Sequence, residues 1–217
     1  MVDGAGGSIG QRLGRDFFAR DPDVVAYDLV GSIMSVRDAD GLVAVRIVET
    51  EAYGGADDAA SHAFAGPTDR CRVMFGPAGH LYVYRVYGVH WCVNVVTGIE
   101  ASASAVLVRA ATYLGPQTSN PVQPPRPSLR GPGNLTRALG VTGADNGSDC
   151  CSTTSRILFH AGSSDADRPE VSVSGRVGVS RNALRPSRYY ATGHRDVSRF
   201  VAGRARGEGI AKTHPTA

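Results

Sequence analysis

The chain has 217 residues, with 23 basic and 20 acidic side chains and a hydrophobic fraction of 42%. This composition excludes a disordered chain, and its apolar runs are shorter than the roughly 20 residues of a membrane-spanning helix. A net charge of +3 is compatible with a polyanionic partner but does not require one.

The length predicts one domain, because a chain of this size buries a sizeable core as a single unit. Its first residues lack a basic segment followed by an apolar stretch, so no secretory signal is predicted. The four cysteines, at positions 71, 92, 150 and 151, have neither disulfide nor zinc spacing. We therefore expect a reduced, cytoplasmic protein without a membrane segment.

The first half of the chain begins with two short helical patterns, at residues 11–20 and 21–29. The second pattern opens with Asp-Pro-Asp, a typical helix start. Residues 32–37 and 42–48 flank a glycine-containing turn and predict a β-hairpin. The β-branched and aromatic block at 81–96, interrupted at Gly88, predicts a second one.

Further strands are predicted at 104–110 and 175–179, and a helix at 135–139 with Asn134 as N-cap and Gly140 after its end. Residues 116–132 contain six prolines and are expected to form a surface loop. Residues 202–217 are expected to be a flexible tail. Because no βα unit repeats, the predicted fold class is α+β, with one domain over 1–201.

Residues 48–53 hold two glutamates at the end of an apolar strand. Strand alternation places Glu49, Glu51 and Tyr53 on one face. Either these carboxylates belong to a site, or the strand simply ends in solvent. His62 follows nine residues later, and a lone histidine is more often structural than catalytic. No second histidine or cysteine has ligand spacing, so no metal site is predicted.

The second informative segment covers residues 81–94. Tyr84 shares a strand face with Tyr82, whereas Tyr87 lies beside the hairpin glycine, where an exposed aromatic could enter nucleic acid as a wedge. The alternative is that these tyrosines are ordinary half-buried strand residues. Asn94 lies among valines, where an amide without partners costs about 1 to 3 kcal/mol. It could therefore serve the fold or contact a ligand.

Six motifs occur in order between about residue 10 and residue 195. They are RIVETEAY at 46–53, His62, LYVY at 81–84 with Tyr87, Gly88 and Asn94, VLVRA at 106–110, GPGNL at 131–135 and RVGV at 176–179. Together they resemble the alkyladenine (3-methyladenine) DNA glycosylase family. The resemblance implies a single mixed domain around a curved, mainly antiparallel β-sheet with a protruding β-hairpin.

The resemblance also implies a mechanism in which a damaged purine is flipped out of duplex DNA, at a cost of a few kcal/mol. Glu51 matches the general base that activates the attacking water. Tyr53 and Tyr84 match the aromatic rings that sandwich the flipped base, and stacking is worth roughly 1 to 3 kcal/mol per base. Tyr87 matches the wedge that fills the vacated space in the duplex.

The remaining family positions surround the flipped nucleotide. His62 matches a residue that contacts it, Asn94 one that lines the pocket floor, and Arg109 one that holds the site and the phosphate region of the DNA. Gly133 and Asn134 open a helix whose N-terminus could face phosphate. For Asn134, a plain N-cap is an equally good interpretation.

The basic residues are 22 arginines and one lysine, Lys212, in the expected tail. Glycosylases that also cut the backbone generally use an amine to form a Schiff base. We therefore expect a monomeric, cofactor-independent, monofunctional enzyme that releases alkylated or deaminated purines and leaves an abasic site, acting in the cytoplasm or at a bacterial nucleoid. The rivals are a catalytically inactive nucleic-acid-binding module of the same fold and a hydrolase of free nucleosides.

Overall fold

The computed structural model describes residues 9–39, 41–115, 126–162 and 168–203. Their helices are α1 (Arg15–Phe18), α2 (Pro22–Leu29) and α3 (Pro132–Ala138), with 3-10 turns at Arg72–Phe75 and Gly143–Asp145. Their strands are β1 (Ile33–Asp38), β2 (Gly41–Tyr53), β3 (Leu81–Val86), β4 (His90–Thr97), β5 (Ser104–Tyr113), β6 (Ile157–His160), β7 (Val171–Ser174) and β8 (Arg188–Ala191). No helix in these ranges is long and apolar enough to cross a bilayer.

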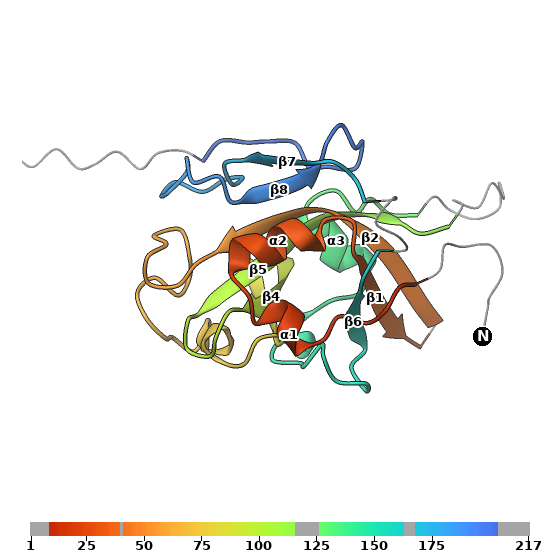
Figure 1. The fold of residues 1–217 in the computed structure, drawn as a ribbon, viewed down its shortest axis with the longest axis horizontal. Coiled ribbons are helices and arrows are strands. Elements are labelled where there is room, and N and C mark those ends of the chain that lie inside the picture. The colour runs from red at the N-terminus through yellow and green to blue at the C-terminus, as the bar shows by residue number, and fades with distance from the viewer. Residues whose placement is uncertain (1–8, 40, 116–125, 163–167, 204–217) are drawn as a thin grey trace, which may run out of the picture.

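The strands of the described residues form one curved sheet in the order β3-β4-β5-β2-β1-β6 (Figure 1). Strand β8 adds to β2 beside this path, β7 pairs with β8, and all of these pairs are antiparallel. The structure confirms the predicted α+β class. Strand β2 is the longest, and it pairs with β1, β5 and β8, so residues 49–51 of its second half are paired along both edges.

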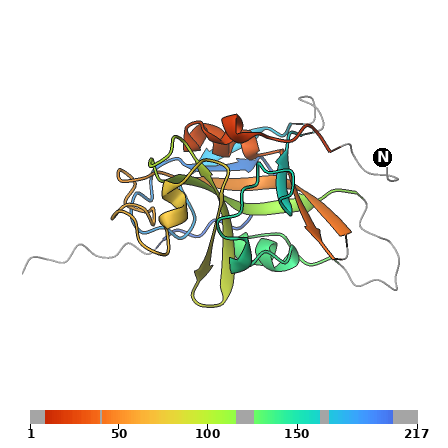
Figure 2. The same ribbon diagram turned by 90° about the horizontal axis from the view of Figure 1, so that it is seen from below.

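The β3–β4 hairpin projects from the body of the molecule with α3 beside it (Figure 2). Two contacts hold the hairpin to this helix. Thr136 Oγ1 donates to the carbonyl oxygen of Trp91 at 2.8 Å. Gly133 lies so close to His90 that a Cβ atom at residue 133 would come within 2.9 Å of the His90 Cβ. The absence of a side chain at Gly133 therefore allows α3 to pack against the hairpin.

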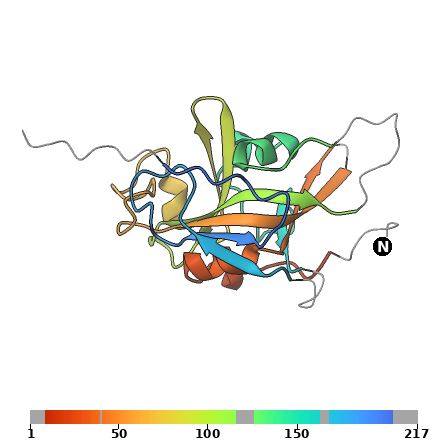
Figure 3. The ribbon, with the colours of Figure 1, turned by 90° about the horizontal axis from the view of Figure 1, so that it is seen from above.

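Two hydrophobic clusters stabilise the sheet. The larger one joins α1, α2 and α3 to the sheet, and Phe18 and Phe159 meet there edge to face with ring centroids 5.7 Å apart. The smaller one lies between the Arg72–Phe75 turn and strands β3 to β5, and it includes Tyr82. Viewed from above, β7 and β8 and the chain after them cross over β2 (Figure 3). This crossing brings the C-terminal part of the chain to the middle of β2.

Most predicted elements are confirmed, including the helix capped by Asp21, whose side chain accepts hydrogen bonds from two backbone N–H groups. The first helix is shorter than predicted, spanning only Arg15–Phe18. Residues 11–13 are instead held beside β6, because Arg12 bridges to His160 and the Leu13 amide donates to the Phe159 carbonyl at 2.9 Å.

Two local predictions in the second half of the chain are wrong. Residues 175–179 are not a strand, because the pairing with β8 ends at Ser174 and Gly178 turns the chain with φ of +73°. Helix α3 begins at Pro132 after Gly131, so Asn134 lies inside it and its Nδ2 donates to the Arg130 carbonyl at 2.8 Å. Gly140 does follow the helix, with φ of +61°. Residues 116–125 and 204–217 lie outside the described residues.

Candidate active site

Two glutamates on one face of β2 are completely buried. Glu49 and Glu51 each have 0% exposure, which rules out the simple explanation that the strand ends in solvent. The hydroxyl of Tyr53, on the same face, donates to Glu51 Oε2 at 2.9 Å. Buried carboxylates need charged or hydrogen-bonding partners, so the neighbouring strands must supply them.

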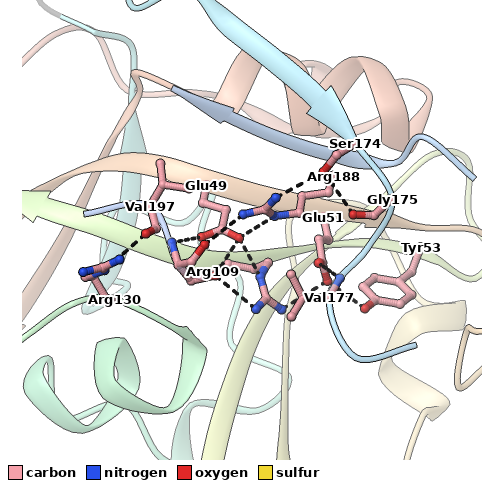
Figure 4. Close-up of polar contacts among 11 residues, drawn as sticks. Glu49, Glu51, Tyr53, Arg109, Arg130, Ser174, Gly175, Val177, Arg188 and Val197 are labelled. Carbon is pink, nitrogen blue, oxygen red and sulfur yellow. Dashed lines mark hydrogen bonds and ion pairs between the residues drawn. The ribbon is translucent and has the colours of Figure 1, made fainter. Parts of the chain in front are cut away.

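Arg109 on β5 binds both carboxylates (Figure 4). Its Nε donates to Glu49 Oε1 at 2.9 Å and its Nη1 donates to Glu51 Oε2 at 3.3 Å. The β2–β5 ladder has a register shift at this point, since Glu49 pairs with Ala110 and the next residue with Val108. Arg109 is therefore the extra residue of a bulge, a feature that redirects a side chain out of the regular ladder.

Glu49 is surrounded by donors. Besides Arg109, it accepts from Arg188 Nε at 2.7 Å, from the Ser198 amide at 2.7 Å and from the Ser198 hydroxyl at 2.8 Å. Burial by itself would raise the pKa of Glu49, but the two guanidinium groups and the Ser198 amide outweigh it and lower the pKa. Glu49 is thus held as a carboxylate.

Glu51 has the opposite shift. Burial raises the pKa of Glu51 above its usual value, although Arg109, the Val177 amide and the Tyr53 hydroxyl all favour the ionised form. The Val177 amide donates to Glu51 Oε1 at 2.7 Å. Two carboxyl groups whose pKa values are pushed apart typify acid–base sites, and here Glu51 is the carboxyl group whose pKa is raised.

A pocket of about 280 Å³ opens beside Glu51. Among its lining residues are six of the side chains selected from the sequence: Tyr53, His62, Tyr84, Tyr87, Asn94 and Arg109. The segment 177–179 forms another part of its wall. The seventh selected residue, Glu51, is bonded to three of the lining residues. The fold thus brings the sequence candidates to one place.

One wall of the pocket is aromatic. The rings of Tyr82 and Tyr84 stack with centroids 5.1 Å apart and planes 25° apart, and His62 meets Tyr84 edge-on at 4.6 Å. His62 is exposed at the rim, and its Nδ1 shares a hydrogen bond of 2.9 Å with the Tyr82 hydroxyl. Asn94 is buried, and its Nδ2 donates to the Tyr82 carbonyl at 2.9 Å. The wall is therefore a fixed surface suited to a flat ligand.

Tyr87 is the exposed member of the set. It lies at the tip of the β3–β4 hairpin with 93% exposure. Both Tyr87 and Gly88 are in the left-handed region, with φ of +51° and +68°, at the centre of a turn closed by the Val89 amide, which donates to the Val86 carbonyl at 3.1 Å. Such a conformation is uncommon for a bulky residue, and here it displays the ring to solvent.

Several site residues were not recognised in the sequence. Arg188 and Ser198 contact Glu49 from a part of the chain about 140 residues away. Asp58 and Arg176 form a buried ion pair behind the pocket. The strand alternation that selected Glu51 also pointed to Glu49, but no local pattern identifies partners so distant. In the described part of the chain, no group of three His, Cys, Asp or Glu side chains could hold a metal ion.

Comparisons with known proteins agree on one family. Residues 16–195 match the family described as Methylpurine-DNA glycosylase (MPG). A protein of Methanoculleus marisnigri is 43% identical over 187 residues, covering 84% of this chain and 96% of that protein. One from Rhodopseudomonas palustris is 42% identical over 204 residues, covering 92% of each. Both carry the name "Putative 3-methyladenine DNA glycosylase". The match extends over most of the chain, which therefore belongs to the methylpurine-DNA glycosylase family.

Proposed function

We propose that the protein is a monofunctional DNA N-glycosylase, which flips an alkylated or deaminated purine out of duplex DNA and hydrolyses its N-glycosidic bond. The observation that carries this proposal is the buried Glu51, bonded to three residues of a pocket that has an exposed tyrosine on its hairpin rim. The family membership supports the same reaction class. The partner is double-stranded DNA, bound by a monomer in the cytoplasm or at the nucleoid.

In this mechanism Glu51 accepts the proton of a water that attacks C1′ of the flipped nucleotide. Arg109 and Val177 both line the pocket and both donate to Glu51, so they connect the carboxylate to the pocket in which the attacking water would be held. The positive charge that develops on the sugar is stabilised by the ionised carboxylate, as in glycoside hydrolysis. The base leaves and an abasic site remains.

Recognition of the base rests on the aromatic wall. The faces of Tyr53 and Tyr84 would stack on a purine, and π faces favour a cationic alkylated base over a neutral one. Asn94 would obstruct the 2-amino group of guanine from the pocket floor, and His62 would contact the nucleotide at the rim. Arg109 is 7% exposed, so we assign its contact with the nucleotide to the inside of the pocket.

Tyr87 would occupy the space that the flipped base leaves. Its exposure and its place on a projecting hairpin support a wedge that keeps the base from returning to the stack. Base-release assays on duplexes that carry 3-methyladenine, 7-methylguanine, hypoxanthine or ethenoadenine would measure which of these purines the enzyme prefers.

Replacement of Glu51 by glutamine is expected to abolish excision while binding to damaged duplex is retained. The amide has nearly the same shape but cannot accept a proton, so the single-turnover rate of base release should fall about 100-fold or more. Glu100→Gln, at an exposed glutamate, is the matched control and should release base like wild type. Full activity of Glu51→Gln would refute the assignment. If the wild-type protein binds duplex DNA but releases no base, it is the catalytically inactive binding module. If it releases bases from free nucleosides, it is the nucleoside hydrolase.

The rate of base release should depend on pH through Glu51. The base form must be ionised, and burial raises the pKa of this carboxyl group, so activity is lost as the pH falls through a value above that of an exposed glutamate. The pH profile of single-turnover release from a neutral lesion measures this midpoint. An acid limb at the position of an ordinary exposed glutamate would contradict the role of Glu51.

Replacement of Tyr87 by serine is expected to reduce excision from duplex DNA more than from single strands, since only the duplex requires a wedge. The measurement is the ratio of the two excision rates for one lesion. Tyr27→Ser, at a half-exposed tyrosine on α2, should leave this ratio unchanged. An equal loss on both substrates would count against the wedge.

The enzyme is expected to lack strand-cleaving lyase activity, because lyases of this kind use an amine and the chain offers only its N-terminus and one lysine, Lys212. Incubation with an abasic duplex and borohydride should therefore trap no covalent complex. Any trapped complex in wild type would overturn this expectation, and its loss in Lys212→Arg would identify Lys212 rather than the N-terminus as the amine.

A further inference from the structure

The pocket wall contains two segments that are far apart in the sequence. Ala60 and His62 come from the loop that follows β2, whereas residues 177–179 follow β7. An ion pair between Asp58 and Arg176 joins these two segments. Both side chains have 0% exposure, and the pair is bidentate, with Nη1 to Oδ2 at 2.5 Å and Nη2 to Oδ1 at 2.8 Å.

Asp58 also organises its own loop. Its Oδ2 accepts from the Gly54 amide at 3.0 Å and its Oδ1 from the Ala60 amide at 3.1 Å. Although burial opposes ionisation, Arg176 and these amides lower the pKa of Asp58 to about 2. Arg176 in turn donates to the Ala52 carbonyl at the end of β2 through Nη1, at 3.0 Å. The pair thus fixes the loop, the strand end and the 177–179 segment relative to one another.

Arg176 reaches the candidate active site in two ways. Its guanidinium carbon lies 4.6 Å from the centroid of the Tyr53 ring. Because Tyr53 lines the pocket and the buried Arg176 does not, the guanidinium covers the face of the ring that points away from the pocket. The next residue along the chain, Val177, donates its amide to Glu51. Arg176 therefore restrains both the ring and the carboxylate.

Stability alone does not account for such a pair. Replacing a buried ion pair by neutral groups of similar size is often neutral or stabilising, because desolvation offsets the attraction. Arg176 Nε, moreover, is a buried donor without a hydrogen-bond partner among the described residues. A buried donor without a partner lowers the stability that the ion pair can contribute. The position of Arg176 is better explained by its contact with the Tyr53 ring and by the Val177 amide that follows it.

We propose that Asp58 and Arg176 are positioning residues, which set the plane of the Tyr53 ring and hold the Val177 amide on Glu51. This inference rests on the proposed function for its kinetic consequence. Its effect on Glu51 is a property of the free protein. The charged and titratable groups facing Glu51 are Glu49 and Tyr53 on β2, Cys92 on β4, Arg109 on β5, Arg188 on β8 and Arg176 itself.

The decisive variant is the double substitution Asp58→Asn/Arg176→Met, which removes the pair without leaving an unpaired buried charge. We expect it to remain folded and to bind damaged duplex within about threefold of wild type, while the single-turnover rate of base release falls about tenfold or more. Because the Val177 amide is no longer held on Glu51, the acid limb should move to higher pH. Arg176→Lys keeps the charge but not the bidentate contact, and should be intermediate.

The matched control is Asp145→Asn/Arg156→Met. In this pair, with Nε to Oδ1 at 2.7 Å, Asp145 is buried and Arg156 is 35% exposed, and neither residue lines the pocket. We expect the control to change the melting temperature without moving the acid limb. If the Asp58/Arg176 variant keeps the wild-type rate and acid limb, or if both pairs change the profile equally, the positioning role is wrong.

A carboxyl ¹³C NMR titration of Glu51 in the free protein tests the inference without catalysis. The Asp58→Asn/Arg176→Met protein should show Glu51 protonating at higher pH than wild type, and the Asp145/Arg156 control should not. An unchanged Glu51 titration would overturn the inference even if the enzyme is active. A shifted titration in a chain that releases no base would leave the inference intact and refute the proposed function instead.

Discussion

Glu49 and Glu51 are ionisable groups that are fully buried in the sheet, where removing each charge from water costs several kcal/mol. Neighbouring strands and the chain after β8 supply hydrogen-bonding and charged partners that offset this desolvation cost. The bulge in β5 directs Arg109 at both carboxylates, β8 delivers Arg188, and the chain after β8 delivers Ser198. Two negative and two positive groups thus balance one another in the interior, and the curved sheet with its C-terminal crossing is the scaffold that makes this possible.

The same strand face holds two carboxyl groups with opposite pKa shifts because their neighbours differ. Glu49 accepts four hydrogen bonds from Arg109, Arg188 and Ser198 and stays ionised. Glu51 accepts hydrogen bonds from Arg109, Tyr53 and Val177, but the effect of burial is larger and its pKa is raised. Guanidinium groups do not titrate in the working range, so the positive half of the network is constant. Of the two carboxyl groups, Glu51, whose pKa is raised, is protonated before Glu49 as the pH falls.

Local patterns in the sequence predict several residues of the candidate site. Strand alternation puts Glu49, Glu51 and Tyr53 on one face, and a glycine between two strands puts Tyr87 at a hairpin tip, because both features depend only on neighbouring residues. The resemblance to a family added His62, Tyr84, Asn94 and Arg109, and the fold gathers all of them around one pocket. The Asp58–Arg176 pair depends on contacts across 118 positions, and no local pattern contains it. The prediction of a strand at 175–179 is wrong for the same reason. The backbone there lines the pocket and bonds to Glu51 instead of pairing with a strand.

The packing of α3 against the β3–β4 hairpin has a mechanical consequence. Trp91 and His90 of β4 contact Thr136 and Gly133, and His90 pairs with Val86 at the end of β3, so α3 supports the hairpin up to the residues beside its tip. Bending the hairpin relative to α3 would break these contacts. A larger side chain at residue 133 would push the helix and the hairpin apart and weaken this support.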